Sequence, residues 1–284
     1  MKICSRNVLV FMTILGSMIY LIPTNAQVTN VITYNIKYDD KNDKVNNWND
    51  RKAYMVHQLR HYDVSIFGLQ EALVHQCQYI DSMMTDFTYV GAGRDDGLQK
   101  GEFSPIFYDS TIFESLQSGT FWLSETPEKP GKSWDAAFPR VCTYVFLNDK
   151  NLNIRFWVFN THFDHIGVNA RIQSAKLISN QIQTFNRENL PVILMGDFNV
   201  EPMDEPIKIL TQHLTDASTI SAKPLYGPNG TFNGFTSDVV DKRIDYFFTK
   251  NMTVLAYSHL DDKLPNGKHI SDHFPVLISV DIGN

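Results

Sequence analysis

The residues best suited to chemistry are polar side chains that stand beside hydrophobic, strand-like runs. A single Asn or Asp after a strand is an ordinary turn former, but six such groups recur along this chain. They are Asn35, Gln70-Glu71, His162 with Asp164 and His165, Asp197 with Asn199, Asp245, and Asp272-His273. Strand ends at one edge of a sheet converge, and carboxylate and amide oxygens with histidine suit a hard divalent cation and a phosphate group.

The elements that must position these groups alternate along the chain. Runs rich in Val, Ile, Phe and Tyr predict strands over 28–38, 64–69, 89–91, 105–108, 141–147, 154–161, 192–195, 244–249, 252–257 and 275–280. Steps of three and four predict helices over 73–84, 169–186 and 206–214, and a further helix capped by Asn49 or Asp50. Because strands and helices are not segregated, the pattern predicts one α/β domain with two sheets and helices outside.

The composition excludes several classes of protein. Of 284 residues, 43% are hydrophobic and 12% aromatic, which is too many for a disordered chain. Twenty-five Lys and Arg against 31 Asp and Glu give a formal charge of −6, which argues against a protein that coats long nucleic acid by charge alone. Three Cys are too few for a disulfide-built fold, and whether Cys77 and Cys142 are bridged stays open.

Residues 1–26 have the pattern of a secretory signal peptide. Lys2 and Arg6 precede an apolar run from Val8 to Ile22, and small residues near Ala26 suit cleavage. The alternative is a membrane anchor, for which the run is shorter than the about 20 residues of a span. We expect an exported protein, periplasmic or extracellular, whose remaining residues 27–284 form a single domain without stable membrane insertion.

Six motifs, taken in order, resemble those of the endonuclease/exonuclease/phosphatase superfamily. They are Asn35, Gln70-Glu71, Asn160-Thr161-His162, Gly196-Asp197-Phe198-Asn199, Ile244-Asp245-Tyr246 and Ser271-Asp272-His273. The resemblance spans nearly all of residues 27–284 and is closest to bacterial exported relatives of the deadenylase-type exonucleases. It implies a four-layer α/β sandwich, with two packed mixed β-sheets flanked by helices. It also implies Mg²⁺-dependent hydrolysis of a phosphoester by in-line attack of an activated water.

The metal ligands implied by the resemblance are all oxygen donors. Glu71 would hold Mg²⁺, with Asn35 and Asp272 in or near its coordination shell, and Mn²⁺ could substitute. One carboxylate with several waters is common for Mg²⁺, so a full cage of protein ligands is not required.

Five residues would carry the chemistry itself. Asp197 would orient and deprotonate the attacking water, and Asn199 would donate to the phosphoryl oxygens. His162 would donate to the same oxygens, while His273, oriented by Asp245, would do likewise or protonate the leaving group. The pairing with Asp245 favours the imidazolium form of His273. Whether a second metal ion binds between Asp197, Asn199 and His273 stays open.

Three further residues are candidates for substrate binding. Arg140 opens a strand at a point where relatives place a basic residue against phosphate, although it could also be a surface residue. Asn160 belongs to the motif around His162, and Arg171 begins the longest predicted helix, where a cation is electrostatically unusual. Glu102 could support Arg140 or His162.

The pattern favours an exported phosphoester hydrolase of phosphodiesterase or nuclease type, and a 3′–5′ exonuclease-like activity is one form of this prediction. The alternatives are a phosphatase or a sphingomyelinase-type hydrolase of phospholipid headgroups, and, outside enzymes, a catalytically silent binding module. The long loops are mixed or acidic, for example 39–43, which favours a short nucleic acid or a small phosphate compound as substrate. We expect a monomer.

Overall fold

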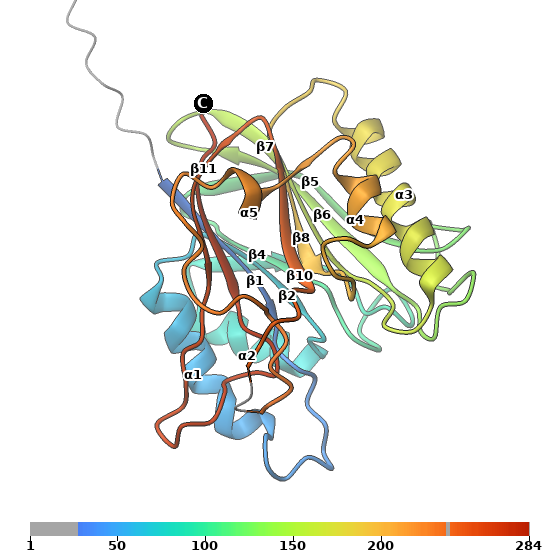
Figure 1. The fold of residues 1–284 in the computed structure, drawn as a ribbon. Helices are drawn as coiled ribbons and strands as arrows, with labels where there is room; N and C mark the ends of the chain where they lie inside the picture. The colour runs from blue at the N-terminus through green and yellow to red at the C-terminus, as the bar shows by residue number, and fades with distance from the viewer. Residues whose placement is uncertain (1–27, 237–238, 284) are drawn as a thin grey trace, which may run out of the picture.

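Two six-stranded sheets pack face to face in a computed structural model that describes residues 28–236 and 239–283 (Figure 1). The predicted signal peptide, residues 1–26, lies outside the described residues. Within the described part of the chain, no helix is long and apolar enough to cross a membrane. Both sheets mix parallel and antiparallel pairs, as the family resemblance implies.

The first sheet brings together strands from both ends of the chain. Its order is β11 (Thr253–His259), β12 (Val276–Asp281), β1 (Val28–Asn35), β2 (Ile66–Gln70), β4 (Ile106–Asp109) and β3 (Phe87–Val90). β1 pairs in parallel with β2, in a register that sets Asn35 opposite Gln70. Glu71, the residue after Gln70, therefore leaves the sheet beside Asn35.

The second sheet carries the other strand ends. Its order is β5 (Phe113–Trp122), β6 (Val141–Asp149), β7 (Ile154–His162), β8 (Val192–Asp197), β10 (Asp245–Lys250) and β9 (Thr215–Asp216). The parallel pairing of β7 with β8 sets His162 opposite Asp197. The antiparallel pairing of β8 with β10 sets Asp245 on the other side of Asp197.

Helices cover the outer face of each sheet. Figure 1 shows α1 and α2 against the first sheet and α3 and α4 against the second. The helices are α1 (Trp48–His61), α2 (Val74–Met83), α3 (Val168–Phe185), α4 (Glu205–Leu210) and α5 (Ala217–Ile220). The core forms three apolar layers, because alternate residues of a strand face opposite ways: Val31 lies between the sheets and Ile32 faces α1. The predicted four-layer sandwich is confirmed.

Several local features differ from the sequence-based expectation. β5 was not predicted, since its middle residues are polar and exposed and it pairs on one side only, as an edge strand. The cap of α1 is Asn47, whose side chain accepts a hydrogen bond from the Asp50 amide, so the assignment to Asn49 or Asp50 was wrong. Cys77 and Cys142 are both buried and free, in the outer layers of opposite sheets.

A buried cation holds the segment that follows β1. Arg51, on α1, is 1% exposed, and its guanidinium donates to the carbonyls of Asn46, Ile36, Ile270 and Lys37 at 2.7–3.3 Å. Such donors satisfy carbonyl groups that a loop cannot pair by itself. The side chain thereby ties the end of the first strand to the loop before β12, and both segments carry candidate site residues.

We predict that Arg51→Met destabilises the protein by about 3 kcal/mol, because the substitution leaves several buried carbonyls without a donor. Urea unfolding at constant pH would measure the change. The matched control is Arg155→Met, which removes only an exposed pair with Glu188 and should cost less than about 1 kcal/mol. Equal losses in the two variants would show that the Arg51 hydrogen bonds add no stability of their own.

Candidate active site

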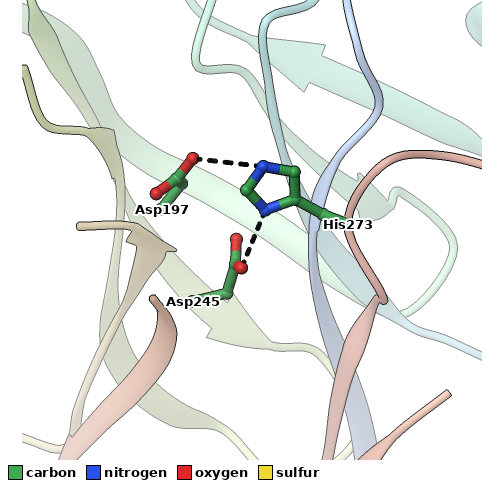
Figure 2. A group of neighbouring side chains, drawn as sticks. All are labelled: Asp197, Asp245 and His273. Carbon is green, nitrogen blue, oxygen red and sulfur yellow. Dashed lines mark hydrogen bonds and ion pairs between the residues drawn. The ribbon is translucent and has the colours of Figure 1, made fainter. Parts of the chain in front are cut away.

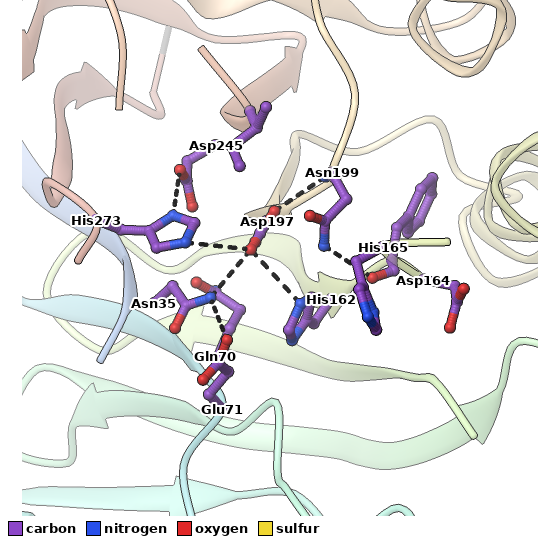
Figure 3. Close-up of polar contacts among 12 residues, drawn as sticks. Asn35, Gln70, Glu71, His162, Asp164, His165, Asp197, Asn199, Asp245 and His273 are labelled. Atoms are coloured by element: carbon purple, nitrogen blue, oxygen red, sulfur yellow. Dashed lines mark hydrogen bonds and ion pairs between the residues drawn. The ribbon is translucent and has the colours of Figure 1, made fainter. Parts of the chain in front are cut away.

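The strand ends of both sheets meet at one edge, where a pocket of about 730 Å³ opens. Asn35 from the first sheet donates to the Oδ2 of Asp197 from the second at 3.0 Å, and to the Oε1 of Glu71 at 3.2 Å (Figure 3). Glu71, Asp197, His162, Asp272 and His273 all line the pocket. The structure thus brings together the residues that the six motifs single out.

Two carboxylates, those of Glu71 and Asp272, form the oxygen-rich side of the pocket. The Oε2 of Glu71 accepts from the Tyr38 amide at 3.1 Å, and Lys37 Nζ lies 3.7 Å from Glu71 and 3.3 Å from Asp272. Burial would raise the pKa of Glu71, but Lys37, His273 and the two hydrogen bonds hold that pKa below its usual value. The carboxylate is therefore ionised at neutral pH and available to a cation.

Asp197 lies at the centre of the site. It is 1% exposed, and besides Asn35 it accepts from the Asn199 amide at 2.9 Å, while the Nε2 atoms of His162 and His273 lie 3.5 and 3.8 Å from its Oδ2. Burial and the nearby Asp245 raise the pKa of Asp197 to about 7. A carboxylate with that pKa can take and release a proton near neutral pH.

The two histidines beside Asp197 carry different charge. The Nδ1 of His273 lies 2.9 Å from the Oδ2 of Asp245 (Figure 2). Although burial alone would lower it, the pKa of His273 is raised to about 10 by Asp245 and by the other carboxylates. Burial, reinforced by Arg140 and other cations, places the pKa of His162 well below its usual value. At neutral pH His273 is thus an imidazolium and His162 a neutral imidazole.

The same cluster also has the spacing of a metal site. One ligand atom each from Asp197, Asp245 and His273 lies within 4.8 Å of the others, and among the described residues this is the one such group (Figure 2). An ion there would compete with the hydrogen bond between His273 and Asp245. The all-oxygen set of Glu71, Asp272 and Asn35 fits the preference of Mg²⁺ better, and Lys37 already places a positive charge between its two carboxylates.

One wall of the pocket is basic. Arg140 lines it, with Nε 3.5 Å from Asp164 and Nη2 3.1 Å from His165. Arg94 also lines the pocket and pairs with Glu102 at 2.6 Å. Glu102 lies 3.9 Å from His162. The hydrogen bonds of Arg140 go to Asp164 and His165, not to Glu102. Glu102 is therefore held by Arg94 and stands beside His162.

Two residues predicted to bind substrate, Asn160 and Arg171, do not line the pocket. Asn160 is fully buried, and its amide donates to the carbonyls of Leu69 and Pro105 and accepts from Gln70, so it joins the two sheets under the pocket floor. Arg171 does not line the pocket, and the Nη1 of its guanidinium donates to the Asp164 carbonyl at 2.9 Å. In both cases a polar side chain beside a site motif satisfies main-chain groups instead of a ligand.

The remaining sequence candidates have mixed roles. Asn199 lines the pocket, and its Nδ2 donates to the Phe163 carbonyl at 3.1 Å, which leaves the second hydrogen of that amide group for a ligand. Asp164 accepts four main-chain amides and so shapes the turn after β7. His165 stacks on Phe138 at the pocket wall.

Sequence reasoning missed three basic residues of the pocket, which are Lys37, Arg94 and Lys242. Lys37 follows Asn35 by two positions, so the first motif could have indicated it. Arg94 stands in a run with Asp95 and Asp96 that looks like an ordinary charged loop, and only the fold shows that its side chain turns inward to Glu102.

The comparisons with known proteins agree with this geometry. Residues 32–273 match the Endonuclease/Exonuclease/phosphatase family. The structure is similar to the mannosyl-6-phosphatase Bt3783 of Bacteroides thetaiotaomicron VPI-5482, with 35% identity and a TM-score of 0.86 over 89% of this chain and 99% of that one. It is also similar to an endonuclease/exonuclease/phosphatase family protein of Bacteroides thetaiotaomicron, with 34% identity and a TM-score of 0.86 over 89% and 97% of the two chains.

A more distant similarity is to an uncharacterised protein of Acanthamoeba polyphaga mimivirus, 25% identical over 234 residues. That match includes 70% of this chain but spans only 34% of the viral protein. The matched family covers every motif from Asn35 to His273, and the fold and the converging strand ends agree with it. The chain is therefore a member of the endonuclease/exonuclease/phosphatase family, whose members hydrolyse phosphoesters.

Proposed function

We propose that this protein is a Mg²⁺-dependent hydrolase that removes phosphate from a small phosphomonoester such as a sugar phosphate. The observation that carries the proposal is the surroundings of the buried Asp197 carboxylate, which lies between a neutral His162 and a positively charged His273. A basic wall stands next to it. This set offers a proton acceptor, a proton donor and cationic groups within one pocket.

The basic wall favours a monoester over a diester. The buried Nε of Arg94 and Nη1 of Arg140 have no hydrogen-bond partner among the described residues. A phosphomonoester carries more negative charge than a diester and presents more free oxygens, so it gains more from two guanidinium groups. The pocket volume suits a small molecule, and the 35% identity to a mannosyl-6-phosphatase supports a sugar phosphate.

The chain's own residues can divide the work of hydrolysis. Mg²⁺, held by Glu71 and Asp272 with Asn35, would act as a Lewis acid toward the phosphoryl oxygens. Asp197 accepts a proton from the attacking water, which its pKa of about 7 allows. On the opposite side of the phosphorus from that water, the leaving oxygen needs a proton.

The imidazolium of His273 can supply that proton from Nε2, because Asp245 holds Nδ1 and fixes the ring. The neutral His162 can donate a hydrogen bond from Nε2 to a phosphoryl oxygen in the tautomer that leaves Nδ1, 3.9 Å from Glu102, without a proton. Together these groups move one proton from the water to Asp197 and another from His273 to the departing alcohol.

We also propose that the protein is exported, on the basis of residues 1–26 alone. Expression of the full chain in a bacterial host, fractionation, and N-terminal sequencing of the product would test this. A mature N-terminus near Gln27 in the exported fraction is expected, and full-length protein confined to the cytoplasm would contradict the proposal.

Two carboxylate variants should separate metal binding from proton transfer. Glu71→Gln should lower kcat by roughly 10³-fold and abolish Mg²⁺ binding measured by calorimetry, because it removes the main anionic ligand. Asp197→Asn should lower kcat by roughly 10²–10⁴-fold but leave most Mg²⁺ affinity, since it removes the proton acceptor. Glu205→Gln, exposed on α4, serves as the control. If Asp197→Asn lost the metal and Glu71→Gln kept it, the two roles would be reversed.

The Asp245–His273 pair predicts a particular pH dependence. Asp245 favours the imidazolium of His273, whose pKa of about 10 keeps activity high until alkaline pH. Asp245→Asn removes that negative charge, so His273 should lose its proton at lower pH and the alkaline limb of kcat/KM should move down. Profiles of both proteins in saturating Mg²⁺ would measure the shift. An alkaline limb at the same pH in both proteins would remove His273 as the acid.

A substrate panel tests the preference for monoesters. With Mg²⁺ present, kcat/KM for p-nitrophenyl phosphate should exceed that for bis(p-nitrophenyl) phosphate by roughly tenfold or more, a difference of ~1.4 kcal/mol in transition-state stabilisation. Mannose 6-phosphate should likewise be a better substrate than oligo(A), duplex DNA or sphingomyelin. Faster cleavage of oligo(A) would favour the exonuclease-like alternative, and faster cleavage of sphingomyelin the lipid alternative.

A further inference from the structure

Lys37 places a positive charge directly against the carboxylates of the proposed metal site. Its Nζ lies 3.3 Å from the Oδ2 of Asp272 and 3.7 Å from the Oε2 of Glu71, so one ammonium group bridges the two carboxylates of the proposed metal site. The side chain is 30% exposed and lines the pocket. It therefore stands between solvent and the carboxylate oxygens that a metal ion would need.

The main chain fixes this placement. Lys37 has a φ of 57°, in the left-handed region that non-glycine residues seldom adopt. Its amide donates to the Asn35 side chain at 3.1 Å, and its carbonyl accepts from Gln76 at 3.1 Å and from the buried Arg51 at 3.3 Å. With the backbone held at three points, only the flexible side chain of Lys37 can change its position relative to the carboxylates.

An ammonium and a divalent cation compete for the same oxygens. Each needs close contact with the lone pairs of Glu71 and Asp272, and the ammonium and the metal ion cannot occupy the space between these two carboxylates at the same time. Two carboxylates with one lysine still carry a net negative charge, so the site attracts a cation of higher charge. The lysine lowers the repulsion between the carboxylates as long as that cation is absent.

We propose that Lys37 is an internal counter-cation of the metal site, which holds the Glu71 and Asp272 carboxylates together and competes with the divalent metal ion for them. The inference rests on the proposed function, because it takes these two carboxylates as metal ligands. Lys37 thereby weakens metal binding and stabilises the metal-free protein. The metal concentration at which the enzyme becomes loaded depends on this one side chain.

Calorimetric titration of Mn²⁺ and Mg²⁺ into chelator-treated protein, without substrate, tests the inference. Lys37→Met should bind the metal roughly tenfold more tightly than the wild type, because the competing charge is gone. Lys37→Arg, which keeps the charge, should stay within roughly threefold of the wild type. Lys41→Met, on the exposed part of the same loop, should match the wild type.

Thermal unfolding provides a second readout. In chelator, Lys37→Met should melt below the wild type because the two carboxylates repel each other, and saturating Mg²⁺ should close most of that gap. If Lys37→Met does not fold, Lys37→Gln takes its place in both measurements.

The outcomes separate the two proposals. Metal affinity that is unchanged or weaker in Lys37→Met, with a wild type that binds the metal, would overturn the role of Lys37 and leave the proposed function standing. Absence of metal binding by both proteins would contradict the proposed function and this inference together. If Lys37→Met binds the metal more tightly than both the wild type and Lys37→Arg, the result supports competition between Lys37 and the metal ion.

Discussion

The site depends on one buried hydrogen bond between the two sheets. Asn35 at the end of β1 donates to Asp197 at the end of β8, at 3.0 Å, and thereby joins a carboxylate of one sheet to an amide of the other. A buried carboxylate is costly unless hydrogen bonds and nearby charges compensate it. Every other group of the floor is arranged around that requirement: the Asn199 amide, the two imidazoles and, behind one of them, Asp245.

The same requirement explains why the two histidines differ. His273 lies between two carboxylates, and its positive charge is favoured from both sides. His162 lies 3.5 Å from the same Asp197, but burial lowers its pKa, and Arg140 and Arg94 on the basic wall disfavour a positive charge there further. Two histidines at similar distances from Asp197 are therefore set to different charge states by their surroundings, so the pocket holds one imidazolium that can give up a proton and one neutral imidazole.

Much of this arrangement could be predicted from the sequence, because strand ends at one sheet edge must converge. That rule was enough to place Glu71, Asp197 and His273 together, and the order of apolar strand-like runs and helical segments was enough to predict two sheets with helices outside. It could not identify β5, whose exposed polar middle hides the strand pattern. Nor could it separate Asn160 from His162, because the two residues share one face of β7 and differ only in depth: Asn160 lies within the packed sheets, and His162 at the strand end lines the pocket.

The basic residues mark a second limit of sequence reasoning, which concerns charge. The chain carries a net formal charge of −6, and that sum argues only against wide electrostatic contact with nucleic acid. It says nothing of the pocket, where Lys37, Arg94 and Arg140 gather from separate loops and strands. Each is paired with a carboxylate, so none of the three is an isolated charge without a ligand. A phosphate group that enters with a metal ion adds charges of both signs, and it can therefore bind without leaving any of these buried cations or carboxylates unpaired.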